Sequence, residues 1–256
     1  MVELPSCAIC RSPVTPSPTS SLLSQWTGHG LVVGLGGIGQ ALVDALGPFA
    51  PGLEVHSAGP SRGHHRLDLC SDASLAAFVA DQGPRLRPLR LVVCTAGLLH
   101  GPDLQPEKRL AQVRRQALER SFAVNAFGPL LLAQALEPLL PRDQPVHFAC
   151  LSARVGSIGD NRLGGWYAYR AAKAAQNQLL RTLALEWRRR LPLATVTLLH
   201  PGTTATGLSE PFRAGVPPER LFSPERAALQ LLRVLDGQTP ERSGAFLAWD
   251  GQPIPW

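Results

Sequence analysis

Lysine and tyrosine are scarce in this sequence. Its 256 residues include two lysines, two tyrosines, one methionine and five cysteines. Arg, Glu, Pro or Gly interrupts every apolar stretch before it reaches about eighteen residues, so the sequence predicts no membrane-spanning helix. The first residues also lack the continuous apolar core of a signal peptide, which argues against secretion.

The cysteines and histidines do not form a complete metal-ligand pattern. Cys7 and Cys10 have half the spacing of a zinc site, but no second Cys or His pair stands at a suitable distance. His64 and His65, taken with Cys70, fit no better. The sequence therefore predicts no metal, and its scattered cysteines are expected to be free thiols.

The charge is basic and rests on arginine. The formal net charge is +6 and the isoelectric point is about 9.5. The arginines spread along the expected helices and form no single tract with interleaved aromatics, so solvated helix faces are favoured over a nucleic-acid surface. Residues 188–190, three arginines in a row, end an expected helix, where cations favour the negative end of its dipole.

The N-terminal residues differ from the rest of the chain. Residues 1–27 are rich in Pro, Ser and Thr with little apolar periodicity, which predicts a loose leader before a single domain over residues 28–256. A cytoplasmic location is expected. The Ser-rich, acid-poor leader also leaves open an organelle transit peptide, although it holds only one arginine.

Apolar runs alternate with helical segments along the domain. The expected strands are nearly continuous in apolar residues, as in a parallel sheet covered on both faces: 31–34, 53–57, 66–69, 89–94, 146–151, 194–199 and 244–249. Expected helices follow at 74–81, 116–140, 168–190 and 224–235. The sequence predicts an α/β fold with a Rossmann-like, doubly wound parallel sheet of about seven strands.

A glycine-rich turn connects the first expected strand to a helix. Gly34, Gly36 and Gly39 fit the pattern G-x-G-x-x-G, with Gly37 and Ile38 inside it. Missing side chains allow the backbone to approach a pyrophosphate at the helix N-terminus. Because the motif follows a strand and precedes a helix, the sequence predicts a dinucleotide-binding site here.

Tyr169 and Lys173 stand four residues apart. With so few of either residue, chance would produce this spacing in about one such sequence in sixty. On a helix the two side chains share one face, and a nearby ammonium favours the phenolate and lowers the tyrosine pKa. The pair is a candidate acid/base device, and a half-buried tyrosine beside a solvated lysine is the alternative.

These features resemble the short-chain dehydrogenase/reductase family over nearly all of the chain from residue 31 to the C-terminus. Asp68, followed by Leu69, looks like the family's aspartate beside the adenine ring. Thr95, Ala96 and Gly97 look like the end of its Asn-Asn-Ala-Gly turn, with Cys94 and Thr95 replacing both asparagines. Pro201, Gly202, Thr203 and Thr206 resemble the turn that closes over the nicotinamide.

The resemblance also assigns the proton relay. Asn125 fits the helix asparagine that holds a water in the family and extends the relay to the lysine, here Lys173. The insert at residues 155–161 and the C-terminal residues 246–256 look like the C-factor-like subgroup, which includes sniffer-type carbonyl reductases.

Two positions depart from the family pattern. The usual glycine motif would place its first glycine at Val33, so the turn is one residue short or begins at Gly34. The catalytic serine is replaced by Ala153. Ser157 is the preferred substitute and Ser152 the other candidate, and it stays open whether either hydroxyl reaches a substrate.

The resemblance implies reversible reduction of a ketone or aldehyde, with Tyr169 as proton donor and Lys173 and Asn125 in support. No carboxylate follows the second strand, which favours NADP over NAD, and Arg62 is the candidate contact for the 2′-phosphate. NAD is not excluded. A dinucleotide-binding sensor with little catalysis, because of Ala153, is the alternative function.

A small carbonyl or alcohol substrate is the expected partner, enclosed by the proline-containing segment 203–223. No nucleic-acid or membrane partner is expected. Family members commonly form dimers or tetramers through long helices such as 116–140 and 168–190, and a monomer is also compatible with the subgroup.

Overall fold

One seven-stranded sheet organises the protein, and every neighbouring pair of its strands is parallel. The computed structural model describes residues 21–256. The strand order is β3-β2-β1-β4-β5-β6-β9. The strands are β1 (Gly28–Val33), β2 (Leu53–Gly59), β3 (His65–Arg66), β4 (Leu89–Cys94), β5 (Val146–Leu151), β6 (Ala194–His200) and β9 (Ala245–Ala248).

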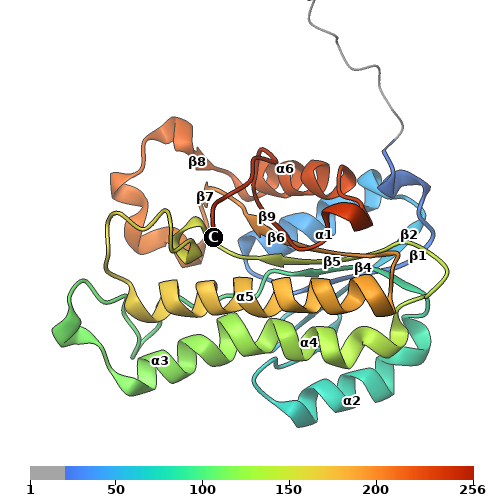
Figure 1. The fold of residues 1–256 in the computed structure, drawn as a ribbon, viewed down its shortest axis with the longest axis horizontal. Coiled ribbons are helices and arrows are strands. Elements are labelled where there is room, and N and C mark those ends of the chain that lie inside the picture. Colours follow the sequence, from blue (N-terminus) through green and yellow to red (C-terminus); the bar gives the residue numbers. More distant parts are fainter. Residues whose placement is uncertain (1–20) are drawn as a thin grey trace, which may run out of the picture.

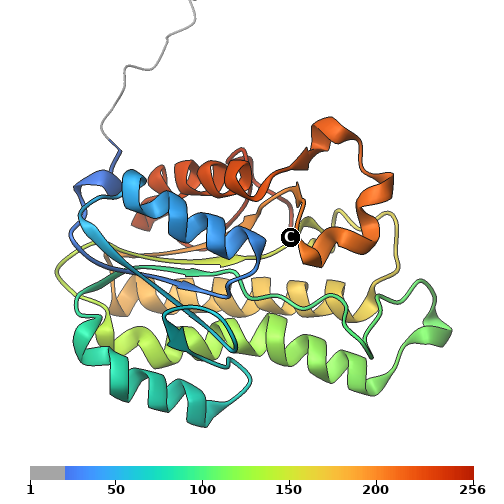
Figure 2. The same cartoon turned by 180° about the vertical axis from the view of Figure 1, so that it is seen from behind.

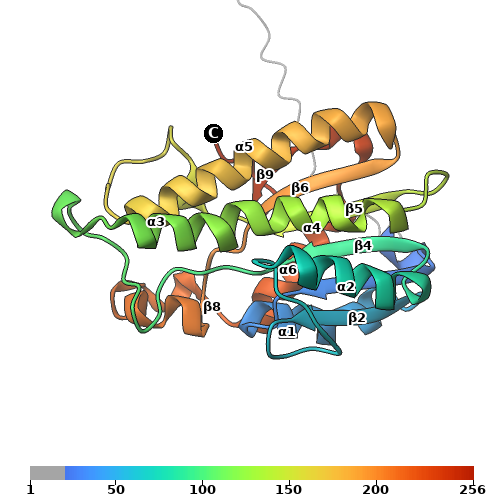
Figure 3. The same ribbon diagram turned by 90° about the horizontal axis from the view of Figure 1, so that it is seen from below.

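Helices cover both faces of this sheet, as Figures 1 and 2 show from opposite sides. Helices α1 (Gly37–Phe49) and α6 (Pro224–Asp236) pack together on one face. The other face carries α2 (Asp72–Gln82), α3 (Arg115–Phe122), α4 (Gly128–Leu136) and α5 (Tyr167–Arg190), seen from below in Figure 3. The expected doubly wound, Rossmann-like fold in one domain is confirmed.

The apolar pattern of the strands explains the two cores. Side chains alternate between the faces of a strand, so Leu31 and Val33 enter the core under α2, α4 and α5, whereas Val32 enters the core under α1 and α6. Strands β4 and β5 are buried along their whole length because both of their faces are covered. Two cores therefore hold the sheet between helical layers.

Most element boundaries lie within a few residues of those expected. Strand β1 begins at Gly28, earlier than expected, because residues 28–30 also pair with β2. The expected strand at 66–69 is wrong in extent, since β3 contains only His65–Arg66 and the chain then turns towards α2. Helix α2 begins two residues early because the Ser71 hydroxyl accepts a hydrogen bond from the backbone N–H of Ser74.

The long helix expected at 116–140 is not uniform. A π-helical segment, Ala123–Phe127, separates α3 from α4, and a 3₁₀ turn, Glu137–Leu139, follows α4. Pro129 lies in the first turn of α4 and has no N–H to donate to the carbonyl of Asn125 four residues earlier. The wider π turn accommodates this missing hydrogen bond and places Asn125 at the break.

The same helical run, Arg115–Leu139, is the one candidate membrane span among the described residues by length and composition. Leu132, Ala133 and Leu136 of this run are buried in the core beneath the sheet. Figure 3 shows the run lying between α2 and α5. It therefore has the place of a core helix of the α/β fold.

The boundary expected at residue 27 requires a correction, because residues 21–27 pack against the domain. Leu23 lies in a short 3₁₀ helix, Leu23–Gln25, and is 1% exposed in the core under α1 and α6. The Ser21 hydroxyl and the Leu23 N–H both donate to the carboxylate of Asp236 at the end of α6, at 2.7 and 2.8 Å. The pair Cys7 and Cys10 lies outside the described residues.

A lobe projects beyond one end of the sheet, drawn in orange in Figures 1 and 2. It begins and ends in a two-stranded parallel ladder, β7 (Thr203–Thr204) with β8 (Leu221–Phe222). A 3₁₀ segment, Gly207–Gly215, forms much of the lobe. The lobe corresponds to the segment expected to enclose a substrate.

Candidate active site

A cavity of about 600 Å³ lies at the carboxyl ends of the central strands. In open α/β sheets this end, where the strand order reverses, is the usual ligand site. Sixteen of the candidate residues named from the sequence line it: Gly34, Gly36, Gly37, Ile38, Gly39, Arg62, Thr95, Ala96, Gly97, Ser152, Tyr169, Lys173, Pro201, Gly202, Thr203 and Thr206. Segments far apart in sequence therefore meet at one site.

The glycine turn brings the backbone close to this cavity. Gly34 has φ +96°, and a Cβ there would lie 2.7 Å from the backbone nitrogen of Ala96. A Cβ at Gly39 would lie 1.9 Å from the carbonyl oxygen of Gly34. Gly34 directly follows β1, one residue later than the family pattern would place the first glycine.

The N-terminus of α1 has the features of an anion site. Gly36 precedes the helix and supplies no side-chain cap, and nothing lies within 4 Å of the position its Cβ would occupy. The first backbone N–H groups of a helix have no partner within the helix and carry the positive end of its dipole. Because Gly36, Gly37, Ile38 and Gly39 all line the cavity, the site fits a dinucleotide pyrophosphate.

The turn after β4 holds the glycine turn in place. The Thr95 hydroxyl donates to the carbonyl oxygens of Gly34 and Val33, the latter at 3.3 Å. This side-chain bond joins the ends of β1 and β4 at the cavity wall. Threonine thus has a structural role at a position where the family pattern has asparagine.

Tyr169 and Lys173 occupy the first turns of α5 and face the cavity together. Both side chains are buried, at 7% and 2% exposure, and the Lys173 Nζ lies 5.8 Å from the centre of the Tyr169 ring. Nζ donates to the carbonyl of Leu151 at 2.8 Å and to Oε1 of Gln176 at 3.0 Å. The helix expected from the sequence therefore places both residues at one wall.

The electrostatics correct one expectation drawn from the spacing. Burial raises the pKa of Tyr169 above its ordinary value, whereas the nearby ammonium was expected to lower it. The desolvation of a phenolate dominates here because the ring is enclosed. Tyr169 therefore keeps its proton at neutral pH.

Burial also disfavours the charged form of Lys173, and for an ammonium this lowers the pKa. Burial lowers the pKa of Lys173 to about 8, while Cys94 and Cys150 act to raise it. These two buried, free cysteines face each other across β4 and β5. Lys173 is therefore close to losing its charge at mildly alkaline pH.

Asn125 lies beside the cavity wall but does not line it. Its Oδ1 accepts from the N–H of Leu98, and its Nδ2 donates to the Leu98 carbonyl and to the Ser121 hydroxyl. The side chain, which is fully buried, thus fixes the loop after Gly97 against the π-helical segment. The side-chain bonds are structural and leave its backbone as the part available for a relay.

The alternative serines are both engaged elsewhere. Ser152 lines the cavity, but its hydroxyl donates to Oδ1 of Asn177 at 2.6 Å. Ser157 is outside the cavity lining, and its hydroxyl oxygen accepts from the N–H of Asp160 at 3.1 Å. Ala153 itself lines the cavity. The geometry therefore gives no support to either serine as the replacement hydroxyl.

Asp68 and Leu69 also lie outside the cavity lining. The Asp68 carboxylate accepts from the N–H of Cys70 at 2.9 Å, and Leu69 is buried in the core. The structure thus uses both residues in the turn before α2. Arg62, by contrast, is exposed at the cavity edge next to Pro60.

Two features of this site were not selected from the sequence. Trp166 packs against Phe212 with the two rings tilted and their centroids 4.7 Å apart, and it lies 6.4 Å from the Tyr169 ring. His200 lines the cavity, and burial lowers its pKa to about 4. Trp166 stands three residues before Tyr169, and His200 stands directly before Pro201. Their closeness in sequence to these candidate site residues is the signal that could have identified them.

The chain belongs to the short chain dehydrogenase family, because the model of that family matches residues 53–216, more than half of the chain. This match confirms the resemblance drawn from the glycine turn and from Tyr169 and Lys173.

Two relatives show the resemblance in sequence. The 1-hydroxy-2-glutathionyl-2-methyl-3-butene dehydrogenase of Rhodococcus sp. (strain AD45) is 39% identical over 193 residues, which cover 74% of this chain and 78% of the relative. The C-signal protein of Myxococcus xanthus is 37% identical over 148 residues, covering 57% of this chain and 83% of the relative. The likeness to C-factor-like proteins is thereby confirmed.

Solved structures share the fold. The NADPH-bound carbonyl reductase from chicken fatty liver has a TM-score of 0.78 at 24% identity, over 90% of this chain and 99% of that one. The carbonyl reductase Sniffer of D. melanogaster has a TM-score of 0.75 at 24% identity, over 90% of this chain and all of that one. These likenesses establish the architecture.

Proposed function

We propose that this protein is an NADP-dependent carbonyl reductase that reversibly reduces a ketone or aldehyde. One observation carries the proposal: Tyr169 and Lys173 are buried side by side at the wall of the cavity that also contains the glycine turn. A phenol, an ammonium and an anion site around one cavity match the needs of a dinucleotide-dependent proton and hydride transfer.

The residues around the cavity fit a dinucleotide. When bound, the nicotinamide group supplies the hydride that adds to the carbonyl carbon. The N–H groups at the start of α1 would hold the pyrophosphate, and Lys173 would bind the nicotinamide ribose. Pro201, Gly202, Thr203 and Thr206 would cover the ring.

The preference for NADP depends on the loop after β2. This loop contains Pro60, Ser61 and Arg62 and no carboxylate to oppose a 2′-phosphate. Arg62 lines the cavity and is free to contact that phosphate in the bidentate manner of a guanidinium. The NADPH found in the chicken liver carbonyl reductase agrees with this preference.

Tyr169 would give its proton to the substrate oxygen as that oxygen gains negative charge. The raised pKa of this phenol keeps the proton in place at neutral pH, which suits the direction of carbonyl reduction. Lys173 and the backbone of Asn125 would return a proton to Tyr169 after each turnover.

The surroundings of Tyr169 favour a substrate with an apolar or aromatic group. Trp166 and Phe212, which lie outside the cavity lining, form an aromatic pair next to Tyr169, and His100 meets Phe212 edge-on with ring centroids 6.4 Å apart. Leu208 adds an apolar side chain from the lobe. A small apolar carbonyl compound is the substrate class that these surroundings fit. A cytoplasmic location for the reaction is part of the same proposal.

A dinucleotide-binding signal protein is the second candidate. Ala153 lacks the hydroxyl that would stabilise the developing oxyanion, and one such donor contributes about 2.7–4 kcal/mol to catalysis. The similarity to C-signal also agrees with a signalling role. The buried Tyr169 and Lys173 favour the enzyme, because nucleotide binding alone needs no proton donor.

Oligomer formation remains a proposal of the same kind. Helices α3, α4 and α5, which correspond to the long helices that family members use to form dimers and tetramers, lie on one face of the sheet in Figure 1. The arginines lie along exposed helix faces, which supports solvation and gives no reason to propose a nucleic-acid partner.

The test is consumption of NADPH with a panel of aldehydes, ketones and quinones, using wild type, Tyr169→Phe and Tyr167→Phe. Tyr167 is the matched control, because it is the other tyrosine and 41% exposed. Tyr169→Phe should lose at least a hundredfold in kcat through loss of the proton donor, while Tyr167→Phe should keep its activity. Full activity in Tyr169→Phe would refute the mechanism. Tight NADPH binding without turnover in any variant would favour the signalling alternative.

A further inference from the structure

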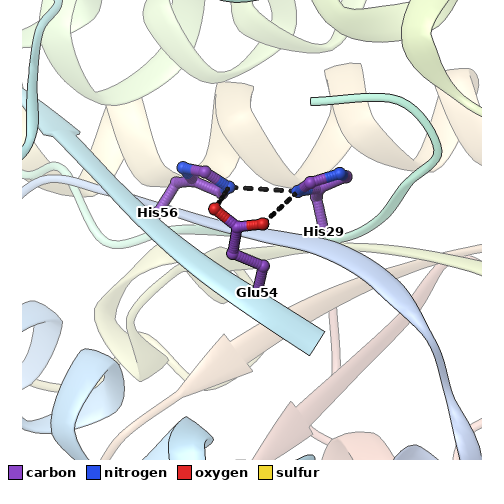
Figure 4. A group of neighbouring side chains, drawn as sticks. All are labelled: His29, Glu54 and His56. Carbon is purple, nitrogen blue, oxygen red and sulfur yellow. Dashed lines mark hydrogen bonds and ion pairs between the residues drawn. The ribbon is translucent and has the colours of Figure 1, made fainter. Parts of the chain in front are cut away.

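Two histidines and a glutamate meet on the sheet at a distance from the cavity. Glu54 and His56 stand two residues apart on β2, so their side chains share one face, and His29 on β1 is the register partner of Glu54. Figure 4 shows the three side chains converging from the two strands. None of them lines the cavity that contains Tyr169.

The ligand atoms have separations that suit a metal ion. The Nδ1 of His29 lies 3.1 Å from the Nε2 of His56. The carboxylate oxygens of Glu54 lie 3.7 Å from the first nitrogen and 3.5 Å from the second. Two ligands about 2.0–2.1 Å from a tetrahedral zinc ion stand about 3.3 Å apart, and the observed distances lie on both sides of this value.

The surroundings hold the imidazoles while leaving one side open. The side chains of His29 and His56 are 17% and 13% exposed, whereas that of Glu54 is 69% exposed. The His56 ring stacks on His65, with centroids 5.8 Å apart. Two ligands are thus fixed by packing, the third can adjust, and water has access to a fourth position.

The two imidazoles face each other through ring nitrogens, Nδ1 of His29 and Nε2 of His56. A neutral imidazole offers the lone pair that a metal requires. Without a metal, the same atoms form a hydrogen bond between the two rings, and this hydrogen-bonded pair is the competing explanation.

We propose that His29, Glu54 and His56 bind a divalent transition metal of the zinc type, with two nitrogen ligands, one carboxylate and water. Imidazole and carboxylate suit zinc, and two of the three ligands come from one strand and the third from its neighbour. The ion would clamp β1 to β2 near their amino ends. This role is independent of carbonyl reduction, because the cavity lies at the opposite ends of the strands.

The site departs from the expectation that the chain binds no metal. Sequence reasoning looked for closely spaced Cys and His pairs, whereas His29 is brought to the other two residues only by the pairing of β1 with β2. The alternation of Glu54 and His56 on a strand was a partial signal, since it predicts a shared face.

The experiment measures zinc binding by the full chain. After treatment with a chelator and dialysis, zinc chloride is titrated into wild type, Glu54→Gln and His56→Gln by calorimetry. Controls are His64→Gln, an exposed neighbour, and Glu219→Gln, an exposed carboxylate elsewhere. We expect one zinc per chain, at least tenfold weaker binding in the two ligand variants and no change in the controls.

Melting temperature and cobalt absorption provide two further tests of the zinc site. Zinc should raise the melting temperature of wild type but not that of Glu54→Gln, whose exposed side chain can change without disturbing the core. Cobalt substituted for zinc should give tetrahedral absorption without a thiolate charge-transfer band. Three results would overturn the proposal. They are absence of zinc binding, binding in Glu54→Gln and His56→Gln as tight as in wild type, and loss of binding in a Cys7→Ser, Cys10→Ser chain.

Discussion

Under the proposed function, Ala153 limits the rate of carbonyl reduction. It lines the cavity with an extended backbone, φ −148° and ψ 145°, at the position where the family has a hydroxyl. The hydroxyls of Ser152 and Ser157 are occupied by Asn177 and by the backbone of Asp160. In the proposed reaction, the carbonyl oxygen of a substrate would therefore receive a hydrogen bond from Tyr169 and from neither serine.

Replacing Ala153 by serine should raise kcat by roughly a hundredfold, since one oxyanion donor is worth about that factor. Steady-state NADPH consumption with a substrate that wild type accepts measures the gain. Ala153→Val is the control, because it adds similar bulk without a hydroxyl and should give no increase. An unchanged kcat in Ala153→Ser would show that another group already stabilises the oxyanion.

Lys173 links catalysis to stability through its buried charge. Its folded-state pKa of about 8 lies below the usual 10.5, so the unfolded chain binds more protons at this site between those values. The free energy of unfolding therefore rises as pH increases through this interval. The charge that the proposed relay requires therefore lowers the free energy of unfolding at neutral pH.

The free energy of unfolding of wild type relative to Lys173→Met should increase by about 1 kcal/mol from pH 7 to pH 9, given about 1.4 kcal/mol per pKa unit. Urea unfolding at the two pH values measures this change. Lys108→Met, which alters the other, exposed lysine, should show no such difference. If the free energies of unfolding of both variants changed with pH in the same way, the loss of stability at neutral pH would not arise from Lys173.

Helix α5 positions Tyr169 and Lys173 through an unusual N-terminus. Trp166 precedes the helix in the left-handed region at φ 53° and provides no side-chain cap. Instead, the buried Glu107 accepts from the N–H of Ala168 with Oε2, and its backbone carbonyl accepts from the N–H of Trp166. A distant carboxylate thus fixes the turn that holds Tyr169 and places a negative charge at the positive end of the helix.

Changing Glu107 to alanine should lower the free energy of unfolding by about 0.5–2 kcal/mol, the range for loss of a cap. It should also reduce kcat, because Tyr169 lies in the first turn of α5. Denaturant unfolding and NADPH consumption measure the two effects. Glu119→Ala, an exposed change on α3, should leave both nearly unchanged. A wild-type kcat in a destabilised Glu107→Ala protein would limit Glu107 to a structural role.

The whole molecule is a sheet between two helical layers, and residues before β1 contribute to one of them. Leu23 is buried beside α6, and the Asp236 carboxylate receives hydrogen bonds from residues 21 and 23. Figure 2 shows this segment meeting the layer of α1 and α6. The folded domain therefore includes at least residues 21–256.

Leu23→Ala should lower the free energy of unfolding by about 2–5 kcal/mol, the usual cost of removing a buried leucine side chain. Leu22→Ala changes an adjacent leucine that is 51% exposed and should alter stability by less than about 0.5 kcal/mol. Thermal or urea unfolding compares the two. Equal stability of both variants would place the domain boundary after this segment, as the composition suggested.

The sequence by itself determined the layers and the position of the glycine turn at the cavity. Apolar runs define strands such as β4 and β5 because a sheet covered on both faces needs them, and the glycines after β1 mark the place where a backbone must approach a ligand. The helical spacing of Tyr169 and Lys173 also follows from local structure. These features depend on neighbours along the chain, so local physics predicts them.

Only the tertiary structure decided the properties that arise from contacts between distant segments. Burial raises the Tyr169 pKa against the effect expected from the lysine, because desolvation depends on the enclosing walls. The packing of Leu23 against α6, the cap of α5 by Glu107 and the meeting of His29 with Glu54 and His56 join residues far apart in sequence. The sequence pattern does not give the spatial distance between such residues. Packing alone sets this distance.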